Sequence, residues 1–507
     1  MKVKARRAVP PARGADDARH DTTLRVVATL FAELHAAGIT YCHWKSNEHL
    51  RAALAGATDL DLLVERRSAP VLARILLDCG FKRFAPAPGL GYPGIEDHFA
   101  LDPETGRLVH LHLHYRLTLG EPRLKGYRWP WEEYVLSTRS FDAGSGVYTA
   151  DPHVELILLL VRSALKVRFR DHLAGAAGSL PVPDGTLREL EWLADRIVPG
   201  RLQEVGDRLI GAEATAMIPA LIAGPLSAGR LRAFRRAIRP APREHRMYGA
   251  LDARLRRWRR ELRATAATVQ KRVSPMAIAP TKRVLPGGGT IVALIGADGT
   301  GKSTLVRETV RWLAPKLDVL SLYFGSGDGP ASTLRRPLEA AASLGARAPL
   351  RALRRPLLRR GWNVLRYAAI AREKRVRLIR ARRARDRGMV VLCDRYPQAQ
   401  FEGCNDGPRL GGEAGHRSRI LRAIAKREEA IYLAATAVPP DLVIRLTAPP
   451  EIAWARKPER SLESHVRRSE ALRALEFPPG TRVVEIDASQ AFDRVLLAVK
   501  RAVWESL

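Results

Sequence analysis

Apolar positions in the C-terminal part of the chain fall into short continuous runs separated by longer amphipathic stretches. The five runs are TIVALIG (290–296), VLSLYFG (319–325), MVVLCDR (389–395), DLVIRLTA (441–448) and RVVEIDAS (482–489). Such runs, alternating with helical stretches, are typical of buried parallel strands joined by βαβ crossovers. The pattern predicts an α/β domain over 288–507, with a parallel sheet flanked by helices.

The N-terminal half has a different rhythm. Between 21 and 150, apolar runs such as TDLDLLV (58–64) and RLVHLHLHYRL (107–117) alternate with helix-like segments, which predicts a small α/β domain. From 151 to 265 the spacing is helical, and it opens with Asp151 as an N-cap and Pro152 at the first helical position. Residues 1–20 lack periodicity and are expected to form a disordered leader. The basic stretch 266–287 is expected to be a linker.

Charge and cysteine content narrow the function classes. The chain has 85 Lys+Arg against 53 Asp+Glu, a formal net charge of +32, which predicts attraction to nucleotides, nucleic acid or an anionic membrane surface. Compositional bias toward arginine explains the excess equally well. The four cysteines form no CxxC pair, and no apolar run approaches the ~18 residues of a membrane span. We therefore expect a soluble cytoplasmic protein, with a peripheral membrane contact left open.

The stretch GADGTGKST (296–304) follows the first apolar run of the C-terminal domain and precedes a helical segment. It fits the pattern GxxxxGK[ST], whose glycines let backbone N–H groups turn toward phosphate oxygens at a helix N-terminus. This context predicts binding of ATP with Mg²⁺, through Lys302 on the β- and γ-phosphates and Ser303 on the metal. The predicted nucleotide-binding residues are Gly296, Asp298, Gly299, Thr300, Gly301, Lys302, Ser303 and Thr304.

The same stretch resembles the phosphate loop of thymidylate kinases, and three later segments strengthen the resemblance. VVLCDRYP (390–397) carries an Asp-Arg-Tyr motif, PDLVIRLTAPPEIAWARKPER (440–460) is similar to the strand and helix leading into the lid, and EIDASQAFDRVLLAVKRAV (485–503) is similar to the closing strand and helix. The resemblance implies a P-loop NTPase fold.

The resemblance also implies roles for individual residues. Asp298 would face the acceptor sugar, Arg395 would hold the acceptor phosphate, Asp394 would orient Mg²⁺, and Arg372 is the candidate for the acceptor base. The catalytic residues it implies are Lys302, Asp394, Arg395, Arg456 and Arg460. Arg467 and Arg468 are further lid arginines. A structural ion pair of Asp394 with Arg395, and solvated helix-face arginines in the lid, stay open as alternatives.

Two segments depart from the thymidylate kinase pattern. LYFGSGDGP (322–330) stands in place of a Glu-Pro-Gly element, and QAQFEGCNDGPRLGG (398–412) replaces the residues that frame thymine. Asp328 and Asp406 are either polar contacts to an acceptor or turn formers. A nucleoside monophosphate of the dTMP type is the default acceptor. A sugar phosphate, a glycan or a lipid-linked acceptor, and a non-catalytic nucleotide-binding regulator, remain alternatives.

Basic residues concentrate in 331–388, which has 18 Lys+Arg and 3 Asp+Glu. This region could meet a large anionic acceptor or, through RGWNVLRYAAI (360–370), a membrane surface. Nucleic acid is disfavoured because aromatic residues are not interleaved with the charges. A homodimer is implied only by the resemblance to thymidylate kinases.

In the N-terminal domain, Asp59 and Asp61 lie two residues apart in a strand-like run, a spacing that directs both carboxylates to one side and toward Mg²⁺. This run resembles the polymerase-β type of nucleotidyltransferases, with Lys45-Ser46 at the usual Gly-Ser position. His112 stands where the third carboxylate is expected. His110, His112 and His114 alternate along one strand, either as transition-metal ligands or as packed histidines. Whether this domain is catalytic is left open.

Overall fold

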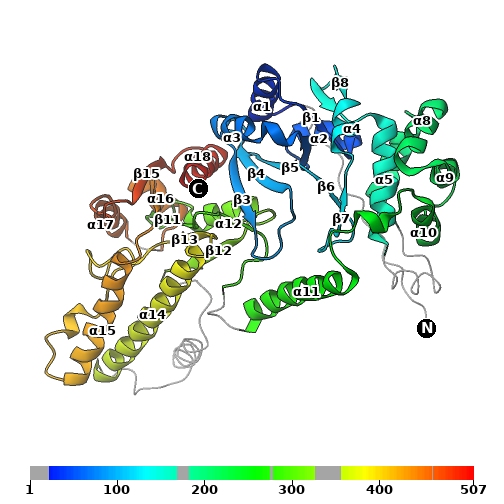
Figure 1. Cartoon of the computed structure of the whole chain (residues 1–507). Coiled ribbons are helices and arrows are strands. Elements are labelled where there is room, and N and C mark those ends of the chain that lie inside the picture. The colour runs from blue at the N-terminus through cyan, green and yellow to red at the C-terminus, as the bar shows by residue number, and fades with distance from the viewer. Residues whose placement is uncertain (1–21, 168–181, 274–277, 326–355, 460) are drawn as a thin grey trace, which may run out of the picture. The chain divides into compact units, whose positions relative to one another are not determined.

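The computed structural model describes residues 22–167, 182–273, 278–325, 356–459 and 461–507 of the 507-residue chain. The chain divides into two compact units. The first falls within Met1–Phe84 and Gly89–Arg263, and the second within Ala85–Pro88 and Ala264–Leu507. Both are α/β, with a mixed sheet in the first and a parallel sheet in the second (Figure 1). The expected leader at 1–20, Asp328 and Arg460 lie outside the described residues.

The mixed sheet of the first unit has the strand order β3-β4-β5-β2-β1-β9-β8. Its strands are β1 Tyr41–His43, β2 Leu60–Val64, β3 Lys82–Pro86, β4 Ile95–Leu101, β5 Leu108–His114, β8 Ser140–Asp142 and β9 Val147–Thr149. A separate hairpin joins β6 Leu117–Leu119 to β7 Tyr127–Trp129. Strand β2 runs parallel to β5 with Asp61 opposite His112, and β4 runs antiparallel to β5 with Asp97 opposite His112. This register brings polar residues of three neighbouring strands together.

Helices surround this sheet and continue beyond it. They are α1 Arg25–Ala36, α2 Leu50–Leu54, α3 Ala69–Asp78, α4 Glu132–Ser137, α5 Pro152–Lys166, α7 Asp184–Ala194, α8 Pro199–Ile210, α9 Ala212–Ala223, α10 Ala228–Ala237 and α11 Ala250–Val273. The expected N-cap of α5 is confirmed, because the Asp151 carboxylate accepts hydrogen bonds from the backbone N–H groups of His153 and Val154. Helix α11 extends into the range 266–287, where the sequence pattern predicted a linker.

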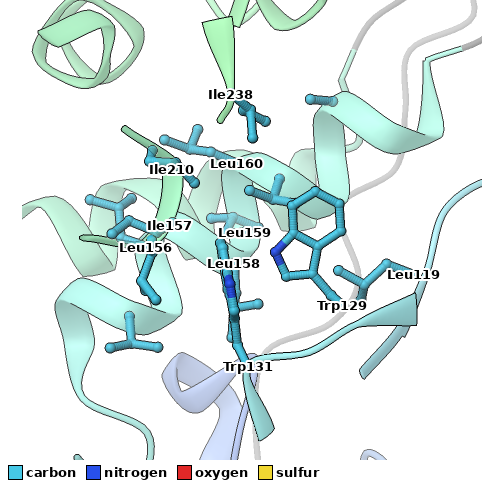
Figure 2. Close-up of a cluster of buried hydrophobic side chains, with 14 of the residues drawn as sticks. Leu119, Trp129, Trp131, Leu156, Ile157, Leu158, Leu159, Leu160, Ile210 and Ile238 are labelled. Atoms are coloured by element: carbon cyan, nitrogen blue, oxygen red, sulfur yellow. The ribbon is translucent and has the colours of Figure 1, made fainter. Parts of the chain in front are cut away.

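Helix α5 is the centre of the helical core. Every residue from His153 to Leu165 is buried, so this helix has no solvent-facing stripe. Figure 2 shows Leu156 to Leu160 of this helix among Trp129, Trp131 and side chains of the later helices. Burial on all sides requires packing partners from several elements. The β6–β7 hairpin and helices α7 to α10 supply them.

The second unit is built on a five-stranded parallel sheet in the order β12-β13-β11-β14-β15. Its strands are β11 Thr290–Gly296, β12 Val319–Tyr323, β13 Val390–Asp394, β14 Leu442–Thr447 and β15 Arg482–Asp487, with a short β10 at Arg283–Val284. The expected parallel sheet of five strands is therefore confirmed. Because β11 has β13 on one side and β14 on the other, its carboxyl end lies where the connections diverge, a place where open α/β sheets bind ligands.

The helices of this unit are α12 Lys302–Leu313, α14 Pro356–Arg385, α15 Arg419–Thr436, α16 Pro450–Arg456, α17 Leu462–Arg473 and α18 Phe492–Ser506. Helix α12 contacts α18, and the long α14 packs against α15 (Figure 1). The core between sheet and helices includes Ile291, Ala293, Val391, Leu378 and Ala381. Among the described residues, no helix is long and apolar enough to cross a bilayer.

Candidate functional site

The backbone of 296–304 makes a tight turn from β11 into α12 that only glycine permits at three positions. Gly299 and Gly301 have φ values of 89° and 81°, in the left-handed region. A Cβ atom on Gly299 would lie 2.0 Å from the carbonyl oxygen of Ala453, and one on Gly296 would lie 2.9 Å from that of Leu446. The glycine spacing seen in the sequence therefore reflects both backbone conformation and close packing.

The side chain of Lys302 lies inside this turn. It is buried, and Nζ donates a hydrogen bond of 2.6 Å to the carbonyl oxygen of Ala297. The pKa of Lys302 is lowered to about 8, mainly by burial and to a smaller extent by repulsion from the Arg395 charge. An anion bound in the turn would offset both effects and favour the charged amine.

Ser303 and Asp394 meet across two elements. The Ser303 hydroxyl donates a 2.5 Å hydrogen bond to Oδ2 of Asp394, which ends β13 directly opposite Leu294 of β11. The other carboxylate oxygen of Asp394 is buried and has no hydrogen-bond partner among the described residues. A hydroxyl and a carboxylate with a free oxygen are the hard ligands that Mg²⁺ prefers. Ser303 and Asp394 could therefore hold that ion.

Arg395, the residue after Asp394, has a left-handed backbone conformation with a φ of 68°. Its guanidinium contacts two carboxylates: Nη2 lies 2.5 Å from Oδ1 of Asp298, and Nη1 lies 3.4 Å from Oδ2 of Asp406. Burial alone would raise the pKa of Asp298, but the Arg395 charge lowers it to about 2. Arg395 pairs with Asp298 and Asp406, and the Asp394 side chain instead faces Ser303.

Lys374 belongs to the same cluster and was missed by sequence reasoning. It is 1% exposed on α14, its Nζ donates to the carbonyl oxygen of Asp406 at 3.0 Å, and it lies over the Tyr432 ring. Burial lowers its pKa to about 8. A signal did exist, because Lys374 shares a helical stripe with the buried residues Ala371, Leu378 and Ala381. The arginine-rich surroundings concealed it.

The remaining predicted residues are dispersed. Arg372 is exposed on α14, and the hydroxyl of Thr300 is bonded to Ala297. Thr304 lies in the first turn of α12 and is partly buried. Arg456 Nη1 donates to the carbonyl oxygen of Ala488, in the turn after β15, at 2.8 Å.

Two of the expected lid arginines lie on α17. Arg467 is exposed, whereas the charge of Arg468 helps to lower the pKa of Asp298. The backbone oxygen of Arg468 also accepts a hydrogen bond from Asn405. Of the arginines expected to form a lid, Arg468 is therefore the described one that lies near Asp298 and the Arg395 cluster.

A second polar cluster lies within the first unit, around Asp61. One carboxylate oxygen of Asp61 lies 2.8 Å from Lys45 Nζ, 3.0 Å from His112 Nδ1 and 3.3 Å from His114 Nε2. Burial lowers the pKa of both histidines, which favours their neutral forms. Asp59 instead pairs with His110 Nδ1 at 2.9 Å, and His110 Nε2 contacts Asp97 at 2.8 Å. The structure thus divides the predicted metal-binding pair between different partners.

Asp61, His112 and His114 together form a candidate metal centre. The two histidine nitrogens are 3.3 Å apart, so the three donor atoms are separated by 3.0–3.3 Å. Tetrahedral ligands with bonds of about 2.0–2.1 Å lie roughly 3.3 Å from one another. The donor set could hold a transition metal. However, the Lys45 ammonium already supplies a cation to Asp61.

No family model matches the chain. It is similar to two curated proteins of Escherichia coli strain K12, both named as uncharacterized ATP-binding proteins. The chain is 28% identical to YghR over 234 residues, which are 44% of this chain and 90% of YghR. It is likewise 28% identical to YghS over 235 residues, which are 43% of this chain and 93% of YghS. The similarity therefore covers nearly all of each relative and less than half of this chain.

Proposed function

We propose that the second unit is a P-loop phosphotransferase that moves the γ-phosphoryl group of ATP to a small phosphorylated acceptor. The observation that carries this proposal is the convergence of Lys302, the Ser303–Asp394 pair and the Asp298–Arg395 pair around one strand-to-helix turn. The names of the two relatives support ATP as the nucleotide. The resemblance to thymidylate kinases supports a nucleoside monophosphate of the dTMP type as acceptor.

Each residue has a role that follows from its position. The backbone N–H groups of the turn and Lys302 bind the phosphates of ATP, and Lys302 exchanges the carbonyl of Ala297 for phosphate oxygens. Bound Mg²⁺, held by Ser303 and Asp394, would neutralise charge on the β- and γ-phosphates. Arg395 orients the acceptor phosphate with its planar guanidinium. Arg468 is the described lid arginine best placed to stabilise the transferring group. Catalysis then rests on positioning and electrostatics.

One observation favours the alternative acceptor, a sugar phosphate or lipid-linked sugar. Asp298 and Asp406 flank Arg395 on both sides, so an acceptor bound there meets two carboxylates beside the one guanidinium. Ionised carboxylates are also good acceptors for sugar hydroxyls. Nucleoside monophosphates and sugar phosphates therefore have to be compared directly.

The test follows ADP release from Mg·ATP with no acceptor, with dTMP, with the other nucleoside monophosphates and with a panel of sugar phosphates. We expect turnover that depends on the acceptor. Lys302→Ala should lower it by at least about a hundredfold, because the variant lacks the ammonium group that stabilises negative charge on the transferring phosphates. Lys426→Ala, at an exposed position on α15, is the matched control. Unchanged turnover in Lys302→Ala would reject this site. ATP binding without turnover on any acceptor would instead assign the protein to nucleotide-dependent regulation.

A further inference from the structure

Helix α11 displays an apolar stripe to solvent. Leu251, Leu255, Trp258 and Leu262 are exposed by 75%, 56%, 69% and 62%. With about 100° of rotation per residue, all four side chains fall within roughly 60° of the helix circumference. Exposed large apolar residues gathered in one stripe indicate an interaction surface, whereas single ones do not.

The opposite face of α11 is fixed to its own unit by arginines. Arg257 lies 3.2 Å from the Glu121 carboxylate. Arg260 donates to the carbonyl oxygens of Arg123 and Gly91 at 2.8 and 2.7 Å. The guanidinium of Arg260 also lies over the ring of Tyr92. The usual orientation of a surface helix is therefore reversed: charged residues face the domain, and the leucines and Trp258 face outward.

Positive charge borders the stripe. Residues 250–263 contain six arginines and two acidic residues, and the exposed Arg254 and Arg259 lie on either side of the apolar positions. Beside α11 is a groove of about 340 Å³ with Tyr127 and Tyr248 in its wall. Its basic lining residues are Arg235, Arg246, Arg254 and Arg257. The groove is large enough for an anionic headgroup, and guanidinium groups bind phosphate with suitable geometry.

We propose that α11 docks the protein on an anionic lipid bilayer, with the stripe inserted at the boundary between headgroups and acyl chains and the groove receiving lipid phosphates. Basic helices with Trp and Leu on one face bind membranes in this manner, and each arginine near an anionic surface strengthens the binding. The spacing of the stripe would also suit a coiled coil with a second copy. In that arrangement Arg254 and Arg259 of one copy would lie close to the arginines of the other, and like charges beside a helix–helix interface are destabilising. An anionic surface neutralises them instead.

The test is co-sedimentation of the whole chain with phosphatidylcholine vesicles, with and without phosphatidylglycerol. We expect binding only when the anionic lipid is present. The combined variant Leu255→Ser, Trp258→Ser, Leu262→Ser should lower the bound fraction at least about tenfold, because it removes the inserted surface. Leu77→Ser, on α3 at 72% exposure, is the matched control and should bind like the unaltered chain.

A second variant, Arg254→Glu with Arg259→Glu, should weaken binding to anionic vesicles by at least about tenfold. Added salt should also weaken the binding of the unaltered chain, because it screens the arginine charges. Circular dichroism checks that each variant is folded. Absence of binding by the unaltered chain, or equal binding by the triple variant, would overturn the proposal. So would a dimer in light scattering that dissociates in the triple variant, because the stripe would then belong to a second copy.

Discussion

The polar clusters around Asp394 and Asp61 differ in what balances the charge of a buried strand carboxylate. In the second unit, Asp394 has one oxygen bonded to the Ser303 hydroxyl and the other buried without a partner among the described residues. In the first unit, a single oxygen of Asp61 is shared by Lys45, His112 and His114. The Asp394 cluster leaves an oxygen for an external cation, whereas the Asp61 cluster already contains the Lys45 ammonium group.

This difference shows that an Asp at a strand end does not by itself indicate a metal site. The charge of a buried carboxylate must be balanced, and a lysine of the chain can provide that balance as well as a metal ion can. We therefore expect the proposed activity of the second unit to depend on a divalent cation. Metal binding by the Asp61 cluster should be limited by Lys45.

The largest expected effect comes from removing the charge at the open site. Asp394→Asn should lower the proposed Mg²⁺-dependent phosphoryl transfer by at least about a hundredfold, because a neutral amide is a poor ligand for Mg²⁺ and supplies no counter-charge. Asp61→Asn should leave that activity unchanged. Steady-state ADP release measured for both variants, at increasing Mg²⁺, checks this contrast. Equal losses in the two variants would contradict it.

A smaller effect is expected when the internal cation is removed. Lys45→Met keeps the length of the side chain but deletes its charge, so Zn²⁺ or Mn²⁺ should bind the Asp61 cluster at least about tenfold more tightly. Calorimetric titration of the metal-free protein measures the change. The double variant Lys45→Met, His114→Ala lacks one donor and should lose the gain. A Lys45→Met protein with unaltered metal affinity would show that the three donors do not form a metal centre.

The last effect is on stability rather than on activity or metal binding, and it compares carboxylates with and without a cationic partner. Burial raises the pKa of Glu155 from the ordinary value of about 4.5 to about 7, although Asn47 donates hydrogen bonds to both of its oxygens. Because the folded pKa is the higher one, this contribution to stability is complete below about pH 4.5 and is lost as the pH rises through about 7.

Glu155→Gln should therefore raise the free energy of unfolding above neutral pH by about 1–3 kcal/mol and change it little near about pH 4.5. Thermal unfolding of the first unit at both pH values gives the comparison. Asp298 should behave in the opposite sense. Its pKa of about 2 means that its stabilising pair with Arg395 is present at neutral pH and lost only in strong acid. Equal gains for Glu155→Gln at both pH values would show that Glu155 does not titrate in this range.

Local features of the fold were predictable from the sequence. The five parallel strands, the turn at 296–304 and the N-cap of α5 each depend on residues within a few positions of one another. Apolar periodicity, glycine at positive φ and an Asp before a helix act through neighbouring backbone, so their consequences can be inferred without the rest of the chain.

Side-chain partners were harder to infer. The sequence suggested that Asp59 and Asp61 act together at a Mg²⁺ site, yet strand register places Asp61 opposite His112, and Asp59 pairs with His110. Lys374 escaped notice because the many arginines around it concealed that it shares a helical stripe with the buried residues Ala371 and Leu378. Both outcomes depend on strands and helices that meet only after folding.

The sequence by itself determined that a glycine-rich turn follows a buried strand, because that turn is specified by nine consecutive residues. Only the tertiary structure decided which carboxylates surround Arg395, which cation meets Asp61, and which face of α11 points to solvent. The physical reason is that charge balance and burial are properties of a residue's whole surroundings. Those surroundings are assembled from segments that lie far apart along the chain.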